Sequence, residues 1–209
     1  MSGRRVVITG RGVASPLGIG VEAHWAGLVA GRSAIRPLPR LSALGLPACR
    51  GGEITPESLS PYLARLPKKQ QKLYNRATLL SMVASALAVE EAGLDRSSVD
   101  AARCGVLLGA NVTSWDFSGL LLPYLEAAES EKEPGVMDLA RANGYCLRAI
   151  NPLDYSLKTL PNLAARHLAI AHNARGFCRA LTAGPIGGIQ ALGQGYWAIR
   201  EGELDLAIC

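Results

Sequence analysis

Arg179-Ala-Leu-Thr-Ala-Gly-Pro-Ile-Gly-Gly-Ile-Gln-Ala-Leu-Gly-Gln194 runs directly into Gly195-Tyr-Trp-Ala-Ile-Arg-Glu-Gly-Glu-Leu-Asp-Leu-Ala-Ile208. Together these stretches predict a strand, a tight glycine-rich turn, an amphipathic helix and a second strand. Such a turn can present a nucleophile at a helix N-terminus, where the helix dipole and free N–H groups favour a thiolate. Here the turn, Gly184–Gly188, contains only glycine, proline and isoleucine, so it has no nucleophilic side chain.

The length and composition predict a single globular domain over residues 1–209. The chain has 49% hydrophobic and 19% charged residues, which is too apolar for a disordered protein. Aromatic residues make up only 5%. This composition favours helices packed closely on a sheet over an aromatic-rich β-sandwich.

The formal net charge of +5 raises the question of nucleic-acid binding. The basic residues are scattered, however, and the densest run is Lys68-Lys69-Gln-Gln-Lys72, without interleaved aromatic side chains. We therefore expect no nucleic-acid partner and interpret the run as a solvated helix face. An acidic carrier protein would use the same charge at least as well.

Cysteine and histidine spacing indicates neither a metal site nor a disulfide framework. The five cysteines are odd in number and lack C-x-x-C spacing, and His167 and His172 are five positions apart. We expect reduced thiols, no cofactor and a cytoplasmic location. No apolar run approaches the roughly 18 residues of a membrane span, so no membrane association is expected.

Strands of continuous apolar character alternate with helical patterns along the chain. The predicted strands are Arg4–Gly10, Cys104–Ala110, Phe177–Thr182 and Leu204–Ile208. The predicted helices are Val21–Ala30, Pro67–Gly93, Leu160–His172 and Gly188–Arg200, with one or two more in 113–150. Residues 11–18 read as a loop, and residues 32–60 as an irregular connection with a short strand near Ala48–Ile54. This order predicts an α/β domain with a mostly parallel sheet.

The order of short motifs resembles the β-ketoacyl-[acyl carrier protein] synthases over essentially the whole chain. The first motif is Arg4-Arg-Val-Val-Ile-Thr-Gly-Arg-Gly-Val-Ala-Ser-Pro-Leu-Gly18. The others are Trp25 with Leu28 and Ala30–Arg36, Ala92–Leu94, Gly105–Gly109, Pro161–Ala164 and Ile199–Asp205. The resemblance implies a thiolase-like layered fold with a central mixed sheet flanked by helices. It covers the N-terminal half of that fold only, as in a short ketosynthase-like or chain-length-factor-like protein.

The resemblance also defines where an active synthase carries its nucleophile. The family's turn reads Thr-Ala-Cys-x-Ser-Gly, and its cysteine takes the acyl chain as a thioester. Alignment from Ala191–Gly193 and Ile199–Gly202 puts Pro185 at the cysteine position, whereas alignment from Thr182–Ala183 puts Gly184 there. Proline also lacks the N–H that would help to hold an oxyanion.

The family draws its other catalytic groups, two histidines or a histidine and a lysine, from the C-terminal half. His24, His167 and His172 lie in the wrong segments to replace them, and Gln190 and Gln194 lie too far along the helix to imitate the glutamine of non-condensing members. No catalytic residue is assigned, and we do not expect an enzyme from this chain alone.

Two features near the turn have both a functional and a structural interpretation. Cys178 is a displaced nucleophile or, as we favour, a small buried hydrophobe. Gly187-Gly188 forms a phosphate cradle or, as we favour, lets the helix pack closely on the sheet, because the G-x-x-x-x-G-K-[ST] pattern is missing.

The resemblance implies two interaction surfaces. The strand Phe177, Cys178, Arg179, Ala180, Leu181 and Thr182 is expected at a subunit interface, where the family pairs this strand between subunits. Lys68, Lys69, Lys72 and Arg76 are the candidate docking residues for an acyl carrier protein. The expected partner is a ketosynthase, a C-terminal-half protein or a second copy of the chain.

Three functional hypotheses follow. The first is a non-catalytic β-ketoacyl synthase-like subunit of a type II fatty-acid or polyketide system, aryl polyene systems included. Such a subunit would pair with an active ketosynthase and either shape its acyl channel or dock its carrier protein. The second is a condensing or acyltransferase enzyme completed by a partner chain, using Cys178. The third is a stand-alone protein that binds an acyl chain.

Overall fold

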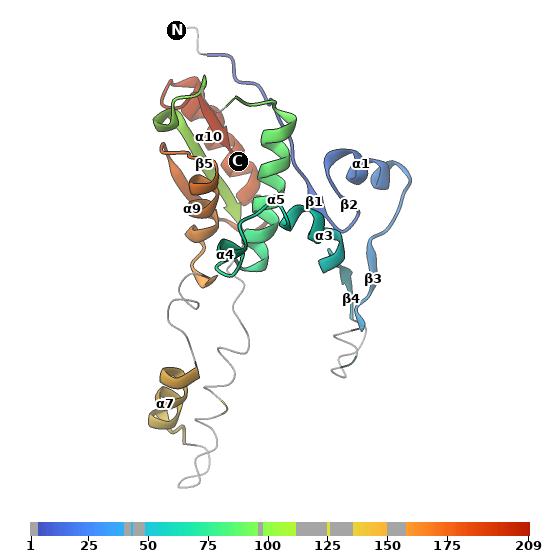
Figure 1. The fold of residues 1–209 in the computed structure, drawn as a ribbon, viewed down its shortest axis with the longest axis vertical. Coiled ribbons are helices and arrows are strands. Elements are labelled where there is room, and N and C mark those ends of the chain that lie inside the picture. The colour runs from blue at the N-terminus through green and yellow to red at the C-terminus, as the bar shows by residue number, and fades with distance from the viewer. Residues whose placement is uncertain are drawn as a thin grey trace.

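The computed structural model describes residues 4–39, 43, 49–95, 98–111, 125, 136–149 and 158–209 (Figure 1). Its strands are β1 (Ala14–Ser15), β2 (Gly18–Ile19), β3 (Ile35–Pro37), β4 (Arg50–Gly52), β5 (Cys104–Ala110), β6 (Cys178–Thr182) and β7 (Leu206–Ile208). Its α-helices are α1 (Val21–Val29), α3 (Pro56–Leu63), α4 (Lys68–Gln71), α5 (Arg76–Glu91), α7 (Leu139–Ala149), α9 (Asn162–Ala171) and α10 (Gly187–Arg200). Short 3₁₀ turns, η2 (Ala101–Arg103) and η3 (Gly184–Ile186), precede β5 and α10.

The central sheet has the order β6-β5-β7, and both strand pairs are parallel. Val106 of β5 lies opposite Cys178 of β6 on one side and opposite Ile208 of β7 on the other. The predicted mostly parallel sheet is therefore confirmed, as are three of the four predicted strands. The run Cys104–Ala110, which forms the central strand β5, is apolar throughout, as is typical of a strand covered on both faces.

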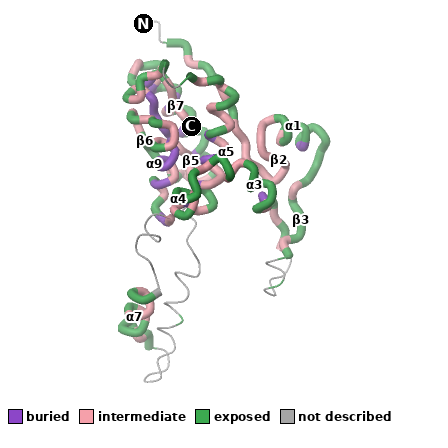
Figure 2. The backbone as a smooth tube through the Cα atoms, in the orientation of Figure 1, coloured by how far each residue is buried: buried purple, intermediate pink, exposed green. Residues whose placement is uncertain are grey.

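Helices cover both faces of this sheet, so the domain has three layers. Val106 and Leu108 of β5 pack with α5 and α9, whereas the intervening Leu107 packs with α10. This alternation follows from the two-residue period of a strand. The buried residues concentrate along β5, α9 and the inner face of α10 (Figure 2).

The single helix predicted over Pro67–Gly93 is wrong, because the chain forms α4 and then restarts at α5. Asn75 causes the break: its side chain accepts a hydrogen bond from the Thr78 N–H at 2.8 Å and donates one to the Lys158 carbonyl at 2.6 Å. An N-cap of this kind requires non-helical backbone at Asn75. The predicted end of the helix is confirmed, since Gly93 follows α5 with φ +56°.

The strand predicted over Arg4–Gly10 is also wrong. The segment forms no ladder with any described strand, and it leaves Val7 59% and Ile8 76% exposed. It runs instead against α5, where a Cβ added to Gly10 would lie only 2.0 Å from the Ala88 carbonyl oxygen. A β-branched run forms a strand only where a neighbouring strand accepts its hydrogen bonds.

The N-terminal third contains more regular structure than the sequence predicts. Residues 11–18 include part of the β1–β2 hairpin, and the region 32–60 contains the β3–β4 hairpin and α3. The strand expected near Ala48–Ile54 is confirmed as β4. Leu59 of α3 is fully buried and packs with Val83 of α5, which connects this part to the three-layered body.

The region 113–150 lies largely outside the described residues, except for α7. The one or two helices expected in 113–150 therefore remain a prediction outside α7. Among the helices that the structure describes, none is long and apolar enough to cross a membrane.

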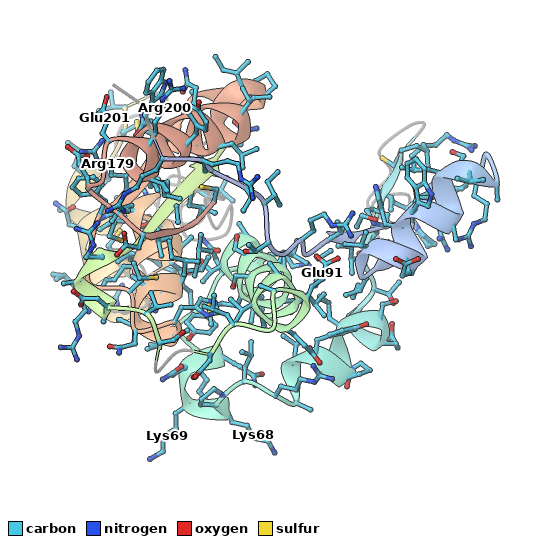
Figure 3. The ribbon with its side chains drawn as sticks, turned by 90° about the horizontal axis from the view of Figure 1, so that it is seen from above. Lys68, Lys69, Glu91, Arg179, Arg200 and Glu201 are labelled. Carbon is cyan, nitrogen blue, oxygen red and sulfur yellow. The ribbon has the colours of Figure 1, made fainter. Side chains whose placement is uncertain are left out.

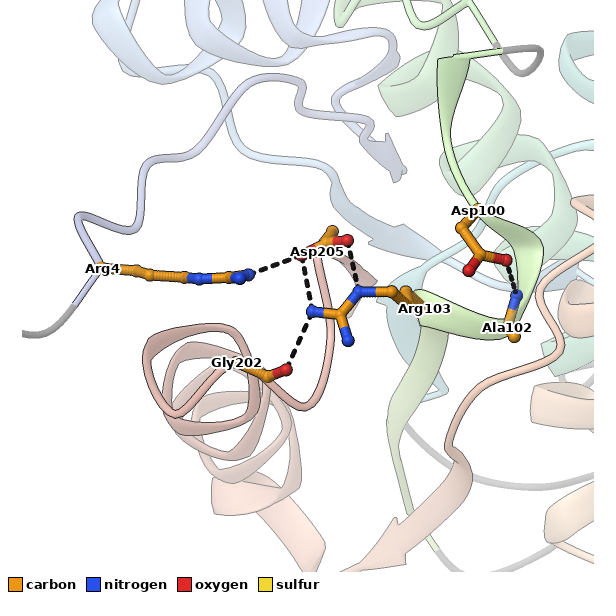
Figure 4. Close-up of polar contacts among 6 residues, drawn as sticks. All are labelled: Arg4, Asp100, Ala102, Arg103, Gly202 and Asp205. Carbon is orange, nitrogen blue, oxygen red and sulfur yellow. Dashed lines mark hydrogen bonds and ion pairs between the residues drawn. The ribbon is translucent and has the colours of Figure 1, made fainter.

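A cluster of two arginines and one aspartate anchors the connection from α10 to β7 (Figure 4). Arg103 donates through Nε to Asp205 Oδ2 at 2.5 Å and through Nη2 to both Asp205 Oδ1 and the Gly202 carbonyl at 2.8 Å. Arg4 reaches the same carboxylate at 2.6 Å. These hydrogen bonds, from Arg103 first and then Arg4, hold the pKa of Asp205 far below its usual range.

Candidate functional site

The turn between β6 and α10 lies at the carboxyl edge of the parallel sheet. Strand β6 ends at Thr182, Gly184 takes the left-handed conformation with φ +57°, and α10 begins at Gly187. The helix has neither a side-chain cap at its N-terminus nor an acidic residue in its first turn. Open sheets with parallel strands place their functional sites at this edge. The turn therefore lies where other proteins with parallel sheets have their catalytic or binding residues.

Two glycines set the position of the turn on the sheet. A Cβ on Gly109, near the end of β5, would lie 2.3 Å from the Gly187 carbonyl carbon, and one on Gly187 would lie 3.0 Å from the Leu181 carbonyl oxygen. The start of α10 thus packs backbone to backbone on β5. Gly188 faces open space instead. The predicted close helix–sheet packing is carried by Gly187 and Gly109 rather than by Gly188.

Gly184 and Pro185, the two residues aligned with the family's nucleophile, form the start of η3. Gly184 has no side chain, and Pro185 has neither a nucleophilic atom nor an N–H. In either register, the turn has no group that could form a thioester bond.

Cys178 lies at the opposite end of β6 from the turn. It is opposite Val106 in the parallel ladder, four residues before Thr182, which corresponds to roughly 13 Å of extended strand. Partial burial raises the pKa of its thiol, whereas a nucleophilic cysteine needs a lowered one. The structure therefore does not bring Cys178 to the turn. The interpretation of Cys178 as a buried hydrophobe is also wrong, because the residue is exposed on the edge strand β6.

The other sulfur close to α10 is Cys209. Its thiol is turned under the helix, where Sγ donates to the Ala191 carbonyl at 3.5 Å, and burial raises its pKa. A Cβ on Gly195 would lie 2.7 Å from this sulfur. Cys209 thus faces the inner side of α10 and not its N-terminus.

The histidines occupy positions unrelated to the turn. His24 on α1 lies 2.7 Å from Ser15 Oγ through Nδ1, and His172 after α9 lies 2.9 Å from Ser85 Oγ through Nε2. His167 is buried within α9. Within the described ranges, no group of His, Cys, Asp and Glu side chains is arranged to hold a metal ion.

A small cavity of about 60 Å³ lies between α5, α9 and the amino ends of the strands, lined by Cys104, His172 and Leu206 among others. It adjoins the beginning of β5, whereas the turn adjoins its end. Sites for small molecules usually occupy roughly 300 Å³ or more. This cavity is therefore too small for an acyl chain.

The predicted docking residues lie on α4 and at the beginning of α5. Lys68, Lys69 and Lys72 are exposed, and Lys68 and Lys69 point away from the body of the domain (Figure 3). Arg76 is also exposed, but its Nη2 donates a short hydrogen bond to the Ile54 carbonyl, so its guanidinium is engaged within the fold. The surface available to a partner therefore consists mainly of the three lysines.

The predicted interface strand is an edge of the sheet formed by the described strands. Cys178, Arg179 and Thr182 are exposed, and Arg179 lies over the Phe177 ring at 4.8 Å from its centroid. The Val106 N–H donates to the Phe177 carbonyl at 2.6 Å. In a parallel ladder, the N–H and C=O of one residue point to the same side of the strand, and the side alternates from residue to residue. Every second residue counted from Phe177 therefore points its backbone groups toward β5, whereas Ala180 points its own outward. The edge can therefore accept another strand.

The family model for the β-ketoacyl synthase N-terminal domain matches residues 3–209. The chain belongs to the β-ketoacyl synthase family. In Streptomyces glaucescens, the alpha subunit of the tetracenomycin polyketide synthase ketoacyl synthase is 32% identical over 99% of this chain and 45% of its own length. The beta subunit is 27% identical over 97% of the chain and 44% of its own length.

The solved structures agree with this assignment of the fold. The ishigamide ketosynthase/chain length factor superposes with a TM-score of 0.73 and 26% identity over 99% of the chain and 47% of its own length. A type II polyketide ketosynthase, solved with its acyl-carrier protein and a hexaketide, gives a TM-score of 0.70 at 16% identity over 99% and 49%. The synthase-like chain thus has the thiolase-like fold and spans about half the length of these relatives.

Sequence reasoning missed the outer face of α10. The exposed apolar residues Ile189, Leu192, Tyr196 and Trp197 lie on the side of the helix turned away from the sheet. The sequence did contain a signal for this face. Large apolar residues stand at these positions, whereas the small residues Ala191 and Ala198 already account for the side that packs on the sheet.

Proposed function

We propose that this chain is a non-catalytic ketosynthase-like subunit of a type II polyketide or fatty-acid system. It would assemble with an active ketosynthase, help to shape its acyl channel and receive its carrier protein. The observation that supports the proposal is the turn at the carboxyl edge of the sheet, where η3 and the start of α10 have no nucleophilic side chain. The proposal includes the assignment of Gly184 or Pro185 to the position of the family's nucleophile.

The edge of β6 supports assembly with a partner. Ala180 presents outward-facing backbone groups, and the exposed Cys178, Arg179 and Thr182 surround them. Unpaired edges of this kind are normally covered or protected, because they otherwise pair with other chains. The similarity to both alpha and beta ketoacyl synthase subunits makes a second ketosynthase-like chain the natural occupant.

Exposed lysines support a role in carrier-protein docking. Lys68, Lys69 and Lys72 lie on one short helix and its end, and their charge suits an acidic carrier protein. One of the structural relatives was solved with its acyl-carrier protein. The proposal assigns the same class of partner to this surface.

The decisive experiment measures binding to the purified ketosynthase encoded nearest to this chain. We expect the wild-type protein and Ala180→Ser to form a stable complex in size-exclusion chromatography with light scattering. Ala180→Pro should abolish the complex, because proline removes the outward N–H that an added strand needs, while an edge strand tolerates it. Circular dichroism must show that both variants fold. Failure of the wild-type chain to bind, or binding unaffected by Ala180→Pro, would reject the β6 assembly.

The same samples test the absence of acyl transfer. After incubation with malonyl- or acyl-carrier protein, the intact mass of the chain should be unchanged. An acyl adduct that is present in the wild type and absent in Cys178→Ala would instead establish the acyltransferase hypothesis. The two measurements separate assembly from chemistry.

A further inference from the structure

Helix α4 is the shortest of the described α-helices, and the residues around it fix its position. It has four residues, none of them buried, and Pro67 provides no side-chain cap at its N-terminus. Gln71 Nε2 donates to the carbonyls of Leu63 and Leu66, both at 2.8 Å. A short element that buries little apolar surface opens more easily than the core of a domain. The order of the lysine surface on α4 therefore depends on the contacts at the ends of this helix.

Tyr74 connects α4 to the hydrophobic core. The residue is 7% exposed and belongs to a buried cluster with Met82 of α5 and Val106 of β5. Its hydroxyl donates to Gln70 Oε1 of α4 at 3.0 Å, and its N–H donates to the Gln71 carbonyl at 3.2 Å. The ring is thus buried in the core while its polar groups hold the end of α4.

The imidazole of His167, on α9, packs against the Tyr74 ring. The ring centroids are 4.7 Å apart and the ring planes lie at 65° to each other. His167 is 8% exposed, and its Nε2 atom is buried without a hydrogen-bond partner among the described residues. A protonated imidazole carries two N–H donors and a positive charge. Protonation here would leave a charged donor without an acceptor, which is a costly arrangement in a protein interior.

Among the described residues, the elements that pack on α9 bring no acidic side chain to this cluster. The buried residues of α5 are Thr78, Met82, Val83 and Ser85, and β5 and β6 contribute Val106, Leu108 and Ala180. None of these side chains ionises, so none can neutralise a charge on His167.

The titratable groups near His167 do not stabilise a proton on it either. Tyr74 is in contact with the imidazole, and burial raises the pKa of its hydroxyl, so it stays neutral near pH 7. His172, at the end of α9, is turned to Ser85 Oγ at 2.9 Å. Burial first, and then the charge of Arg166, lowers the pKa of His167. A proton on His167 is therefore accommodated only by movement of a neighbour.

Tyr74 is the neighbour that moves at the lowest cost. Leu163, Ala165 and Leu168 are at most 6% exposed and fix α9 in the core, whereas Tyr74 lies in the short connection between α4 and α5. Rotation of Tyr74 out of the cluster would bring water to His167 Nε2 and break the hydrogen bond to Gln70. We propose that His167 and Tyr74 form a latch that holds α4 on the domain and opens when His167 binds a proton.

An open latch would no longer hold Lys68, Lys69 and Lys72 in one arrangement, and an acidic carrier protein would then bind more weakly in mild acid (Figure 3). This consequence rests on the proposed function, because it concerns the same lysines. The latch itself does not depend on what binds to α4.

The pH range of the latch follows from the two states of His167. In the open state the imidazole is solvated and has its ordinary pKa of about 6.5. In the closed state its pKa is lower, so the proton binds to the open state in preference. The closed latch is fully favoured above about pH 6.5 and is lost as the pH falls from there through the lower closed-state pKa. Between pH 7.5 and 5.5, opening should become about tenfold more frequent.

Hydrogen exchange of the purified full chain tests the latch without any partner. The amides of Gln70, Gln71, Leu73 and Tyr74 are hydrogen-bonded in the closed state. After correction for the intrinsic exchange rate at each pH, their protection in the wild type should fall by about tenfold between pH 7.5 and 5.5. His167→Phe cannot take up a proton, so its protection should be the same at both pH values.

Two further variants make this test specific. His24→Gln removes a titrating imidazole on α1, where His24 Nδ1 lies 2.7 Å from Ser15 Oγ, so the response of α4 should remain as in the wild type. Tyr74→Phe keeps the ring beside His167 but removes the hydroxyl that donates to Gln70. In that variant α4 should exchange faster at both pH values and still respond to pH, which tests the latch even where His167→Phe alters the core.

Either of two exchange results would overturn the latch. If the amides of α4 are unprotected at pH 7.5, no closed state exists. If their protection falls equally in the wild type and in His167→Phe, other groups cause the response to acid.

Binding of an acidic acyl carrier protein is measured separately at the same two pH values. At pH 7.5, the wild type and His167→Phe should bind equally, and at pH 5.5 the wild type should have lost up to about tenfold more affinity than the variant. Equal losses would show that the latch does not control the lysine surface. Absence of binding at pH 7.5 would reject the docking function and leave the exchange result, and so the latch, unaffected.

Discussion

His167 packs within α9 against the edge of the Tyr74 ring, with the ring centroids 4.7 Å apart. It is 8% exposed, and its Nε2 has no hydrogen-bond partner among the described residues. Burial, and secondarily the charge of Arg166, lowers the pKa of this imidazole. A buried histidine without a partner is stable only as the neutral form.

This environment predicts that the protein loses stability in mild acid. The folded state holds the pKa of His167 below the unfolded value of about 6.5, so the unfolded chain binds the proton more readily. The stabilisation is complete above the unfolded value and is lost as the pH falls from there through the lower folded pKa. Urea unfolding at pH 7.5 and 5.5 should show a larger acid-induced loss of unfolding free energy in the wild type than in His167→Phe. An equal loss in both proteins would assign the acid sensitivity to other groups.

The sequence correctly predicts those helices and strands whose local pattern agrees with the way they pack in the fold. The apolar run Cys104–Ala110 forms β5 because helices cover both faces, and the glycine-rich turn begins α10 because Gly109 and Gly187 allow close approach. The run Arg4–Gly10 has the same pattern but no neighbouring strand among the described residues, and it forms none. Strand formation depends on pairing partners, which a sequence pattern does not contain.

The candidate site was likewise predictable where it depends on local sequence, and not where it depends on contacts between distant segments. The absence of a nucleophilic side chain in the turn Gly184–Gly188 follows from residue identity alone, and the place of the turn at the sheet edge follows from the strand–turn–helix pattern. The engagement of Arg76 with the Ile54 carbonyl depends on a contact between segments 22 residues apart, which spacing does not reveal. The outer face of α10 was missed because large apolar residues on a helix ordinarily indicate its buried side.

The contact between β5 and α10 gives a second prediction. Gly109→Ala would place a Cβ 2.3 Å from backbone atoms of Gly187 and force the helix away from the sheet, which should lower the unfolding free energy by about 1–3 kcal/mol. Gly188→Ala is the matched change one residue further along, where the Cβ meets open space. It should be neutral or stabilising by up to ~1 kcal/mol. Chemical denaturation measures both, and similar values for the two variants would contradict the backbone-to-backbone contact.

At the scale of the whole molecule, charge and apolar surface are distributed unevenly. The net charge of +5 includes the exposed lysines of α4, whereas the outer face of α10 is largely apolar. Charged patches raise association rates with oppositely charged partners, and apolar stripes supply short-range affinity. In the proposed function, the lysines of α4 and the β6 edge would let a carrier protein and a ketosynthase bind at separate places.

The carrier-protein surface makes the last prediction. Lys68→Glu, Lys69→Glu and Lys72→Glu combined should weaken binding of an acidic acyl carrier protein by roughly tenfold or more, mainly through slower association. Arg5→Glu, Arg36→Glu and Arg50→Glu change the net charge by the same amount at exposed positions outside α4, and should have a much smaller effect. Surface plasmon resonance at 50 and 300 mM salt measures both, and the difference between the variants should shrink at the higher salt, where charges are screened within a few ångströms. If the two triple variants bind equally weakly, net charge rather than a surface on α4 attracts the carrier protein.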